Sequence, residues 1–134
     1  MGRNDSKKTT DAELDVLNVL WHKGPSTVRD VHDSLTSAKD IRYTTTLKTL
    51  QVMAGKGLVD RDESSKAHIY RAAVGQEETQ KSLVGDLVEK AFGGSAAGLM
   101  AGALSAKKAS AEELAEMRRL LEEAEKQGQV SGVK

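Results

Sequence analysis

The chain of 134 residues contains no cysteine, one proline and four aromatic side chains, and it lacks a long apolar run. Without cysteine there can be no disulfide bond, thiolate metal site or cysteine nucleophile, which fits a reducing compartment. The longest weakly apolar stretch, residues 96–106, is too short to span a bilayer, and the polar first eleven residues show no signal peptide. We therefore expect a soluble, cytoplasmic protein without a membrane partner.

The chain also has no net charge, with 20 basic and 20 acidic residues, which by itself does not favour a nucleic-acid partner. The distribution is uneven, because residues 1–74 hold 12 basic and 10 acidic side chains, whereas residues 75–134 hold 8 and 10. No acidic residue occurs between Ile41 and Val59. A gap of this length also arises by chance fairly often, but it marks the segment best suited to face a polyanion.

Capping signals and apolar periodicity predict two helices near the start of the chain. The first begins at a capping box formed by Thr10 and Glu13 and continues to Lys23, after which Gly-Pro ends it. The second opens at Ser-Thr, with Thr27 as its N-cap and an acidic residue three positions later.

A third helix and a hairpin are predicted next. Residues 41–43 favour an extended segment, Thr44 is the expected N-cap of a helix that ends at Lys56, and a glycine follows. Residues 58–63 and 68–73 carry strand-favouring side chains on either side of a short polar turn. Three helices followed by a two-stranded ribbon are typical of a winged helix-turn-helix DNA-binding domain.

The composition changes after residue 74, so we expect a winged-helix domain at residues 10–74 and a helical region at residues 75–127. The termini, residues 1–9 and 128–134, are expected to be flexible. Three short amphipathic helices without a sheet cannot easily bury their apolar faces alone, which favours burial against a second copy of the chain. The side chains predicted at this dimer interface are Leu83, Leu87, Leu99, Leu114, Met117, Leu120 and Leu121.

Helical geometry divides the third helix into an inner and an outer face. Leu47, Leu50 and Ala54 are predicted to point towards the first two helices. The outer face is predicted to carry Thr45, Lys48, Thr49, Val52 and Lys56. Lysine can neutralise phosphates or reach a guanine, and threonine can contact base edges or phosphates.

We predict that DNA is contacted by this outer face, by the start of the helix and by the hairpin. Val52 suits a thymine methyl, with a plain exposed or packing role as the alternative. The threonines at 44–46 can equally act as helix caps, Tyr43 can be half-buried, and Lys66 can simply be solvated. The predicted DNA-binding residues are Arg42, Tyr43, Thr44, Thr45, Thr46, Lys48, Thr49, Val52, Lys56, Lys66 and His68.

The sequence shows no converging catalytic or metal-binding set. His22, His32 and His68 fall on separate predicted elements without metal-ligand spacing. Gly-Gly at 93–94 is not followed by the lysine and hydroxyl residue of a phosphate-binding loop. We therefore expect no enzyme activity, no cofactor and no metal.

With these residues laid out, the chain resembles the penicillinase-repressor family, the BlaI, MecI and CopY type, from about Glu13 to Glu123. The resembling segments are Ala-Glu-Leu at 12–14, Leu-Trp at 20–21, Gly-Pro-Ser-Thr-Val at 24–28, Tyr-Thr-Thr-Thr-Leu at 43–47, Lys-Gly-Leu-Val at 56–59 and Glu-Glu-Leu at 112–114. The resemblance implies a homodimeric repressor on a dyad operator, with the third helix in the major groove and the C-terminal helices forming the dimer. It also implies control of genes for β-lactam resistance or a related stress response.

In this family induction often follows cleavage by a membrane metalloprotease sensor, which is therefore a second implied partner. The cleavage position maps near Ser95-Ala96, where the Asn-Phe pair of well-known members is missing. Family members often carry a basic residue in place of Val52, and copper sensing requires thiolates that this chain lacks.

Two alternatives to a dedicated repressor stay open at this point. A ligand-responsive regulator of the MarR type would bind a small molecule at its dimer interface, although the low aromatic content argues against a rich pocket there. A winged-helix module that binds only protein is opposed by the acid-free third helix alone.

Overall fold

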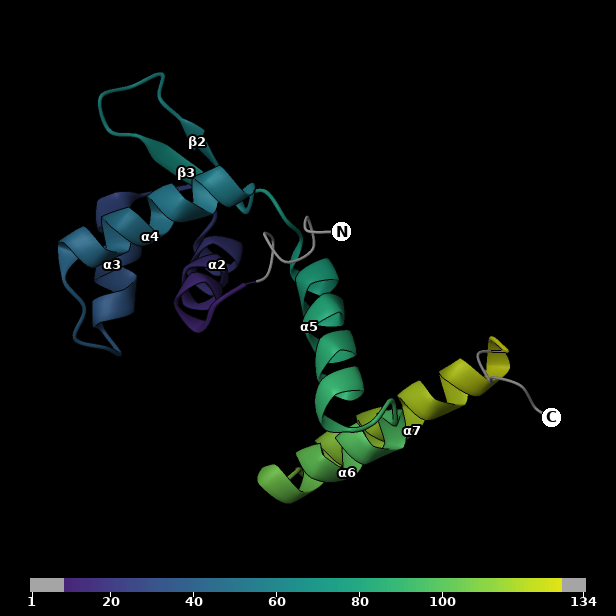
Figure 1. Cartoon of the computed structure of the whole chain (residues 1–134). Helices are drawn as coiled ribbons and strands as arrows, with labels where there is room; N and C mark the ends of the chain where they lie inside the picture. Colours follow the sequence, from purple (N-terminus) through teal and green to yellow (C-terminus); the bar gives the residue numbers. More distant parts are fainter. Residues whose placement is uncertain (1–8, 129–134) are drawn as a thin grey trace. The chain divides into compact units, whose positions relative to one another are not determined.

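The computed structural model describes residues 9–128, most of which are helical (Figure 1). The elements are α2 (Asp11–Lys23), β1 (Ser26–Thr27), α3 (Val28–Thr36), α4 (Tyr43–Lys56), β2 (Val59–Asp62), β3 (Ile69–Ala72), α5 (Gln76–Ala91), α6 (Ala96–Ala106) and α7 (Ala111–Lys126). The predicted winged-helix fold, three helices followed by a hairpin, is confirmed. The termini predicted to be flexible lie outside the described residues, apart from Thr9 and Gly128. Within the described range no helix has the length and apolar character needed to cross a membrane.

The first two helices begin at capping boxes, as their sequences predict. The Thr10 hydroxyl accepts the Glu13 amide at 3.1 Å, and Glu13 Oε1 accepts the Thr10 amide at 3.0 Å. The same reciprocal pair joins Thr27 and Asp30, at 3.1 and 3.2 Å. Each box satisfies backbone donors that have no partner inside the helix. Gly24, with a φ of +91°, then turns the chain away from α2.

The core lies between α2, α3, α4 and the β2–β3 hairpin, which extends away from the three helices in Figure 1. Its ten buried apolar side chains are Val16, Leu17, Leu20, Val31, Leu35, Leu50, Met53, Leu58, Val59 and Tyr70. Trp21 packs at the edge of this core, and its Nε1 donates to the Val74 carbonyl at 2.9 Å. This bond ties the segment that follows β3 to α2, so the wing and the helices form one unit.

The sheet has three strands in the order β1-β3-β2, one strand more than predicted. Ser26 pairs with Tyr70 and Thr27 pairs with Ile69, both antiparallel. The prediction of an extended segment at residues 41–43 holds for the backbone of Arg42 but not for Tyr43, which already belongs to α4, and no strand pairs there. The residues that pair instead are those that lead into the N-cap of α3, where the extended backbone of Thr27 (φ −79°, ψ 169°) matches the free edge of β3.

The start of α4 also differs from the prediction, because Thr44 is not its N-cap. The N-cap is Arg42, whose extended backbone (φ −76°, ψ 148°) carries no side-chain capping bond. Its carbonyl accepts the amides of Thr45 and Thr46 at 3.0 and 3.2 Å. Thr44 therefore lies within the first turn, one residue inside the helix. At the other end, Gly57 ends α4 in the left-handed conformation as predicted.

The chain divides into two compact units, and the division falls after Leu83, inside α5. In the C-terminal unit, Phe92 lies against the small-residue face of α6. A Cβ atom added to Gly102 would come within 3.1 Å of the Phe92 ring, and one added to Gly98 within 3.5 Å. The two glycines, four positions apart, therefore provide the space in which this ring packs.

Candidate nucleic-acid interface

The buried side of α4 defines which side chains the helix presents to solvent. Thr46, Leu50 and Met53 are at most 1% exposed, so they form the inner face. The side chains on the opposite face are the α4 ridge, which consists of Thr44, Lys48, Gln51 and Val52. Val52 is 44% exposed, and no residue of the ridge is acidic.

The inner face differs from the predicted one by a rotation of part of a turn. Leu50 is buried as predicted, but Leu47 and Ala54 are half-buried at its edges, and Met53 takes a central position. Thr46, predicted as a DNA contact, is buried, and its Oγ1 lies 3.0 Å from His32 Nδ1. The prediction for Thr46 is therefore wrong, because a side chain inside the core cannot reach DNA.

Lys56 does not lie on the outer face as predicted, because it contacts the start of α2. Its Nζ donates to Glu13 Oε1 and Oε2 at 3.0 and 2.8 Å. Glu13 is buried, and its side chain also closes the capping box of α2. Burial by itself raises the pKa of the Glu13 carboxyl, but Lys56 and the Thr10 amide together outweigh it, and this pKa lies below its ordinary value. Lys56 is half-buried and joins α4 to α2 through this ion pair.

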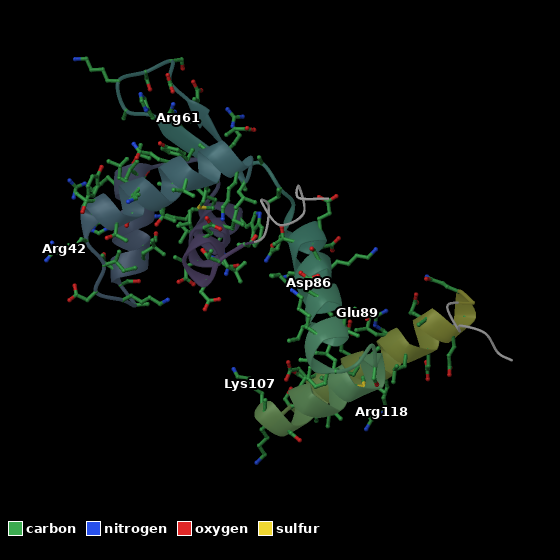
Figure 2. All side chains as sticks on the ribbon, in the orientation of Figure 1. Arg42, Arg61, Asp86, Glu89, Lys107 and Arg118 are labelled. Atoms are coloured by element: carbon green, nitrogen blue, oxygen red, sulfur yellow. The ribbon has the colours of Figure 1, made fainter. Side chains whose placement is uncertain are left out.

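The remaining predicted residues at the start of α4 lie together on the surface. Arg42, Thr44 and Thr45 are exposed, and Arg42 projects from the beginning of α4 in Figure 2. The first turn of α4 has no acidic residue and no side-chain cap, so backbone amides there can bind an anion. This end of the helix is therefore suited to a phosphate group.

Tyr43 is held at this end by two side chains of α3. Its ring meets the His32 ring edge to face with centroids 5.3 Å apart, and the Arg29 guanidinium lies 5.0 Å above it. Tyr43 is 38% exposed, so both of its predicted roles, packing and surface contact, are compatible with its position. His32 also touches Thr46, and it thereby connects α3 to both sides of the first turn of α4.

Thr45 and Thr49 lie beside the ridge, on the side that faces α2. Thr49 is half-buried, and its hydroxyl donates to the Thr45 carbonyl at 2.9 Å. This bond leaves the Thr49 oxygen with acceptor capacity alone. Of the two, Thr45 is the more exposed residue.

The hairpin presents Lys66 and His68 to solvent, as predicted for the wing. The turn before them is organised by Asp62, whose Oδ1 accepts the Ser64 amide at 2.9 Å. Arg61, labelled on the hairpin in Figure 2, pairs with a neighbouring carboxylate, Glu63, at 2.5 Å. The wing therefore carries acidic as well as basic side chains, and Lys66 and His68 are the basic side chains of its loop.

Sequence reasoning missed two residues of this surface, Gln51 and Arg29. Gln51 is exposed on the ridge one turn after Lys48, and glutamine can pair in a bidentate manner with adenine. A helical projection centred on Met53 rather than Leu47 would have identified it. Arg29 is exposed on α3, and its place over Tyr43 follows from helix packing, which no sequence pattern reveals.

The predicted dimer side chains all lie in α5, α6 and α7, where none of the described residues is buried. Leu87, Leu120 and Leu121 are exposed by 47%, 53% and 53%. Leu83, Leu99, Leu114 and Met117 are half-buried. Large apolar side chains at such exposure indicate a surface that the single chain does not cover.

The described residues contain no group of three or more side chains placed to hold a metal ion. Three core helices, a β-hairpin wing and an acid-free exposed helix define the class: this is a winged-helix protein. The chain belongs to the penicillinase repressor family, whose sequence model matches residues 9–123.

Individual relatives are regulators as well. The chain is 37% identical over 82 residues to the transcriptional regulator BlaI of Mycobacterium tuberculosis, which covers 60% of this chain and 59% of BlaI. It is 21% identical over 118 residues to the methicillin resistance regulatory protein MecI of Staphylococcus aureus, which covers 88% of this chain and 96% of MecI. A MecI of Staphylococcus epidermidis matches to the same extent.

Proposed function

We propose that the protein is a DNA-binding transcriptional repressor that acts as a homodimer on a dyad operator. The observation that carries this proposal is the α4 ridge, which is exposed, free of acidic side chains and continuous with an uncapped helix N-terminus. A helix of this kind fits the major groove, where its side chains reach base edges while its first turn binds the backbone.

Each part of the surface has a distinct role in this proposal. Gln51 reads adenine, Val52 contacts a thymine methyl, and Lys48 binds a guanine edge or a phosphate. Arg42 and the α4 amides bind the backbone at one end of the contact. The exposed tip of the wing, with Lys66 and His68, contacts the backbone further along the duplex.

The homodimer is proposed because the C-terminal helices leave their apolar faces uncovered. The exposed leucines of α5 and α7 would gain about 25 cal/mol for each Å² buried against a second copy. Two copies related by a twofold axis would present two α4 ridges, and the operator would then share that symmetry.

Family membership supports β-lactam resistance genes or a related stress response as the regulated targets. A sensor protease is proposed as a further partner on the same basis, and the corresponding cleavage position near Ser95-Ala96 lacks the Asn-Phe pair of well-known members. Ser95 and Ala96 are exposed at the start of α6, where the Ser95 hydroxyl accepts the Gly98 amide at 2.8 Å. A cleavage there would require this capped turn to open first.

The test is selection of bound sequences from a random DNA pool, followed by mobility-shift titration of the selected site. We expect a dyad sequence, and the affinity should fall steeply as salt rises. Lys48→Ala should weaken binding and lower the salt slope by about 1. Lys108→Ala removes the same charge from an exposed position in the C-terminal unit and serves as the matched control. Equal affinities for both variants would contradict the assignment of α4.

A further inference from the structure

A hollow of about 270 Å³ lies between α2, the segment that follows α3, and α4. Its apolar floor consists of Val16 from α2, Leu35 near the end of α3, and Ile41, and the exposed Ala12 of α2 lines its mouth. A cavity of about 150 Å³ lined by aliphatic side chains is large enough to bind benzene. The hollow therefore has room for a substituted single ring.

The wall formed by α4 consists of Thr45, Thr46 and Thr49. The hydroxyls of two of them are already engaged, Thr46 with His32 at 3.0 Å and Thr49 with the Thr45 carbonyl at 2.9 Å. Because these two hydroxyls already have hydrogen-bonding partners, a ligand in the hollow would contact the threonine methyl groups of this wall. The hollow exists because short threonines stand here, whereas the next inner position of α4 is filled by Leu50.

Charged side chains also line the hollow, and their sum is negative. Asp11 and Asp15 contribute two carboxylates, and Lys39 contributes one ammonium group. Lys39 Nζ pairs with Asp15 Oδ2 at 2.6 Å, which leaves the charge of Asp11 as the excess. The partial positive charge at the start of α2 offsets part of this excess. A ligand with one positive charge complements the site, and an anion of the same shape does not.

We propose that this hollow binds a small organic amine, with an apolar body of about one ring against Val16, Leu35 and Ile41 and an ammonium group beside Asp11. The class follows from two features together, the apolar floor and the negative charge excess. An apolar body packs against this floor, in which Val16 and Leu35 are buried and Ile41 is half-buried, and the ammonium group balances the carboxylate.

The site is next to the surface proposed to bind DNA, and its link to DNA rests on the proposed function. Thr45 and Thr49 also line a second hollow of about 290 Å³, which Lys48 and Val52 share. An amine seated on the recessed floor adds positive charge beside the ridge without extending over it. It should therefore raise the affinity for DNA, and DNA should raise the affinity for the amine by the same factor.

The first experiment uses the full chain without DNA and three probes of equal shape: benzylamine, benzyl alcohol and benzoate. Methyl NMR spectra should show saturable shifts of Leu35 and Ile41 with benzylamine, weaker shifts with benzyl alcohol and the weakest with benzoate. Benzoate binding as tightly as benzylamine would overturn the assignment of a cationic ligand. Absence of any shift at these methyl groups with benzylamine would overturn the site.

Two pairs of variants locate the binding. Ala12→Leu fills the mouth of the hollow at an exposed helix position and should abolish benzylamine binding, whereas Ala111→Leu at the start of α7 should leave it unchanged. Asp11→Asn should weaken binding by about two- to fivefold, as expected for one exposed ion pair. Asp86→Asn, on α5 (Figure 2), is its control. Unchanged binding in both Ala12→Leu and Asp11→Asn would overturn the proposal.

The DNA measurement separates this inference from the proposed function. With ammonium chloride at equal ionic strength as reference, benzylamine should tighten binding of the selected DNA by about twofold, the scale of one exposed charge interaction. Ala12→Leu should lose this effect. Amine binding without a change in DNA affinity would overturn the coupling. A chain that binds no DNA would contradict the proposed function, while the Leu35 and Ile41 shifts would still decide the site.

Discussion

The two units of this chain differ in how far they bury their apolar side chains. In the N-terminal unit, ten apolar side chains are buried around α2, α3, α4 and the hairpin. Among the described residues of α5, α6 and α7 none is buried, and leucines such as Leu87 and Leu121 stay about half exposed. Isolated amphipathic helices have little stability of their own in water. The difference indicates that the first unit is stabilised by its own core, whereas the second depends on burial against another surface.

The largest expected effect tests the core side of this comparison. Leu50→Ala removes a fully buried side chain of α4 and should lower the free energy of unfolding by about 2–5 kcal/mol. Leu104→Ala removes the same atoms from a position of α6 that is 40% exposed, and it should cost less than about 1 kcal/mol. Urea titrations followed by circular dichroism measure both. Equal losses would show that the C-terminal unit has a core of its own.

The next effect tests the exposed apolar side chains of the C-terminal unit. Leu121→Glu places a charge on the exposed stripe of α7 and should weaken self-association at least about tenfold, since burying an unpaired charge costs more than the 1.4 kcal/mol that this factor represents. Sedimentation velocity across a concentration series should then show monomers. Gln80→Glu adds the same charge to an exposed polar position of α5 and controls for charge alone. A dimer that persists in Leu121→Glu would exclude this stripe from the interface.

A smaller effect compares the ion pairs of the two units. The pKa of Glu13 is lowered on folding from its ordinary value of 4.5, so its pairing stabilises the fold above about pH 4.5 and is lost as the pH falls through the lower folded pKa. Glu13→Gln should therefore flatten the fall in unfolding free energy as the pH drops below about 4.5. Glu116→Gln removes a carboxylate of an exposed pair with Arg119 and should change this profile less. Thermal unfolding at each pH gives the profile, and a steeper acid loss in Glu13→Gln would contradict the sign.

The smallest effect concerns two glycines at the end of α4. A Cβ at Gly55 meets nothing within 4 Å, so Gly55→Ala should stabilise the protein by about 0.5–1 kcal/mol through helix propensity. Gly57 has a φ of +83°, and Gly57→Ala should destabilise by about 1 kcal/mol because alanine disfavours this conformation. Both shifts are measurable in the midpoint of urea unfolding. Stabilisation by Gly57→Ala would mean that this glycine does not end the helix as described.

Local signals predicted much of the fold. The capping boxes of α2 and α3 depend on residues three positions apart, so Thr10-Glu13 and Thr27-Asp30 are readable without any tertiary information. The glycine that ends α4 is equally local. The β1 strand was not predicted because its partner, β3, lies more than 40 residues away and no local sequence signal around Ser26 indicates the pairing.

Only part of the candidate site was predicted, because the rest depends on contacts between distant segments. The exposed character of Lys48 and Val52 follows from helical periodicity, and these residues do lie on the ridge. Thr46 and Lys56 were misplaced because polar side chains are usually assigned to the surface. In the folded unit, Thr46 forms a hydrogen bond with His32 of α3, and Lys56 pairs with the buried Glu13 of α2. Both partners come from segments distant in the sequence.

The amino-acid sequence by itself determined the order of the helices and the hairpin, the capping boxes of α2 and α3, the glycine that ends α4 and the acid-free stretch that became the α4 ridge, because each depends on neighbours within a few residues. Tertiary packing decided the rotation of α4, the edge strand, the pairing of Lys56 with Glu13 and the hollow beside the ridge. These features depend on which side chains from distant segments meet. A buried polar side chain costs free energy unless a hydrogen-bonding partner is present, and local sequence does not show whether one is.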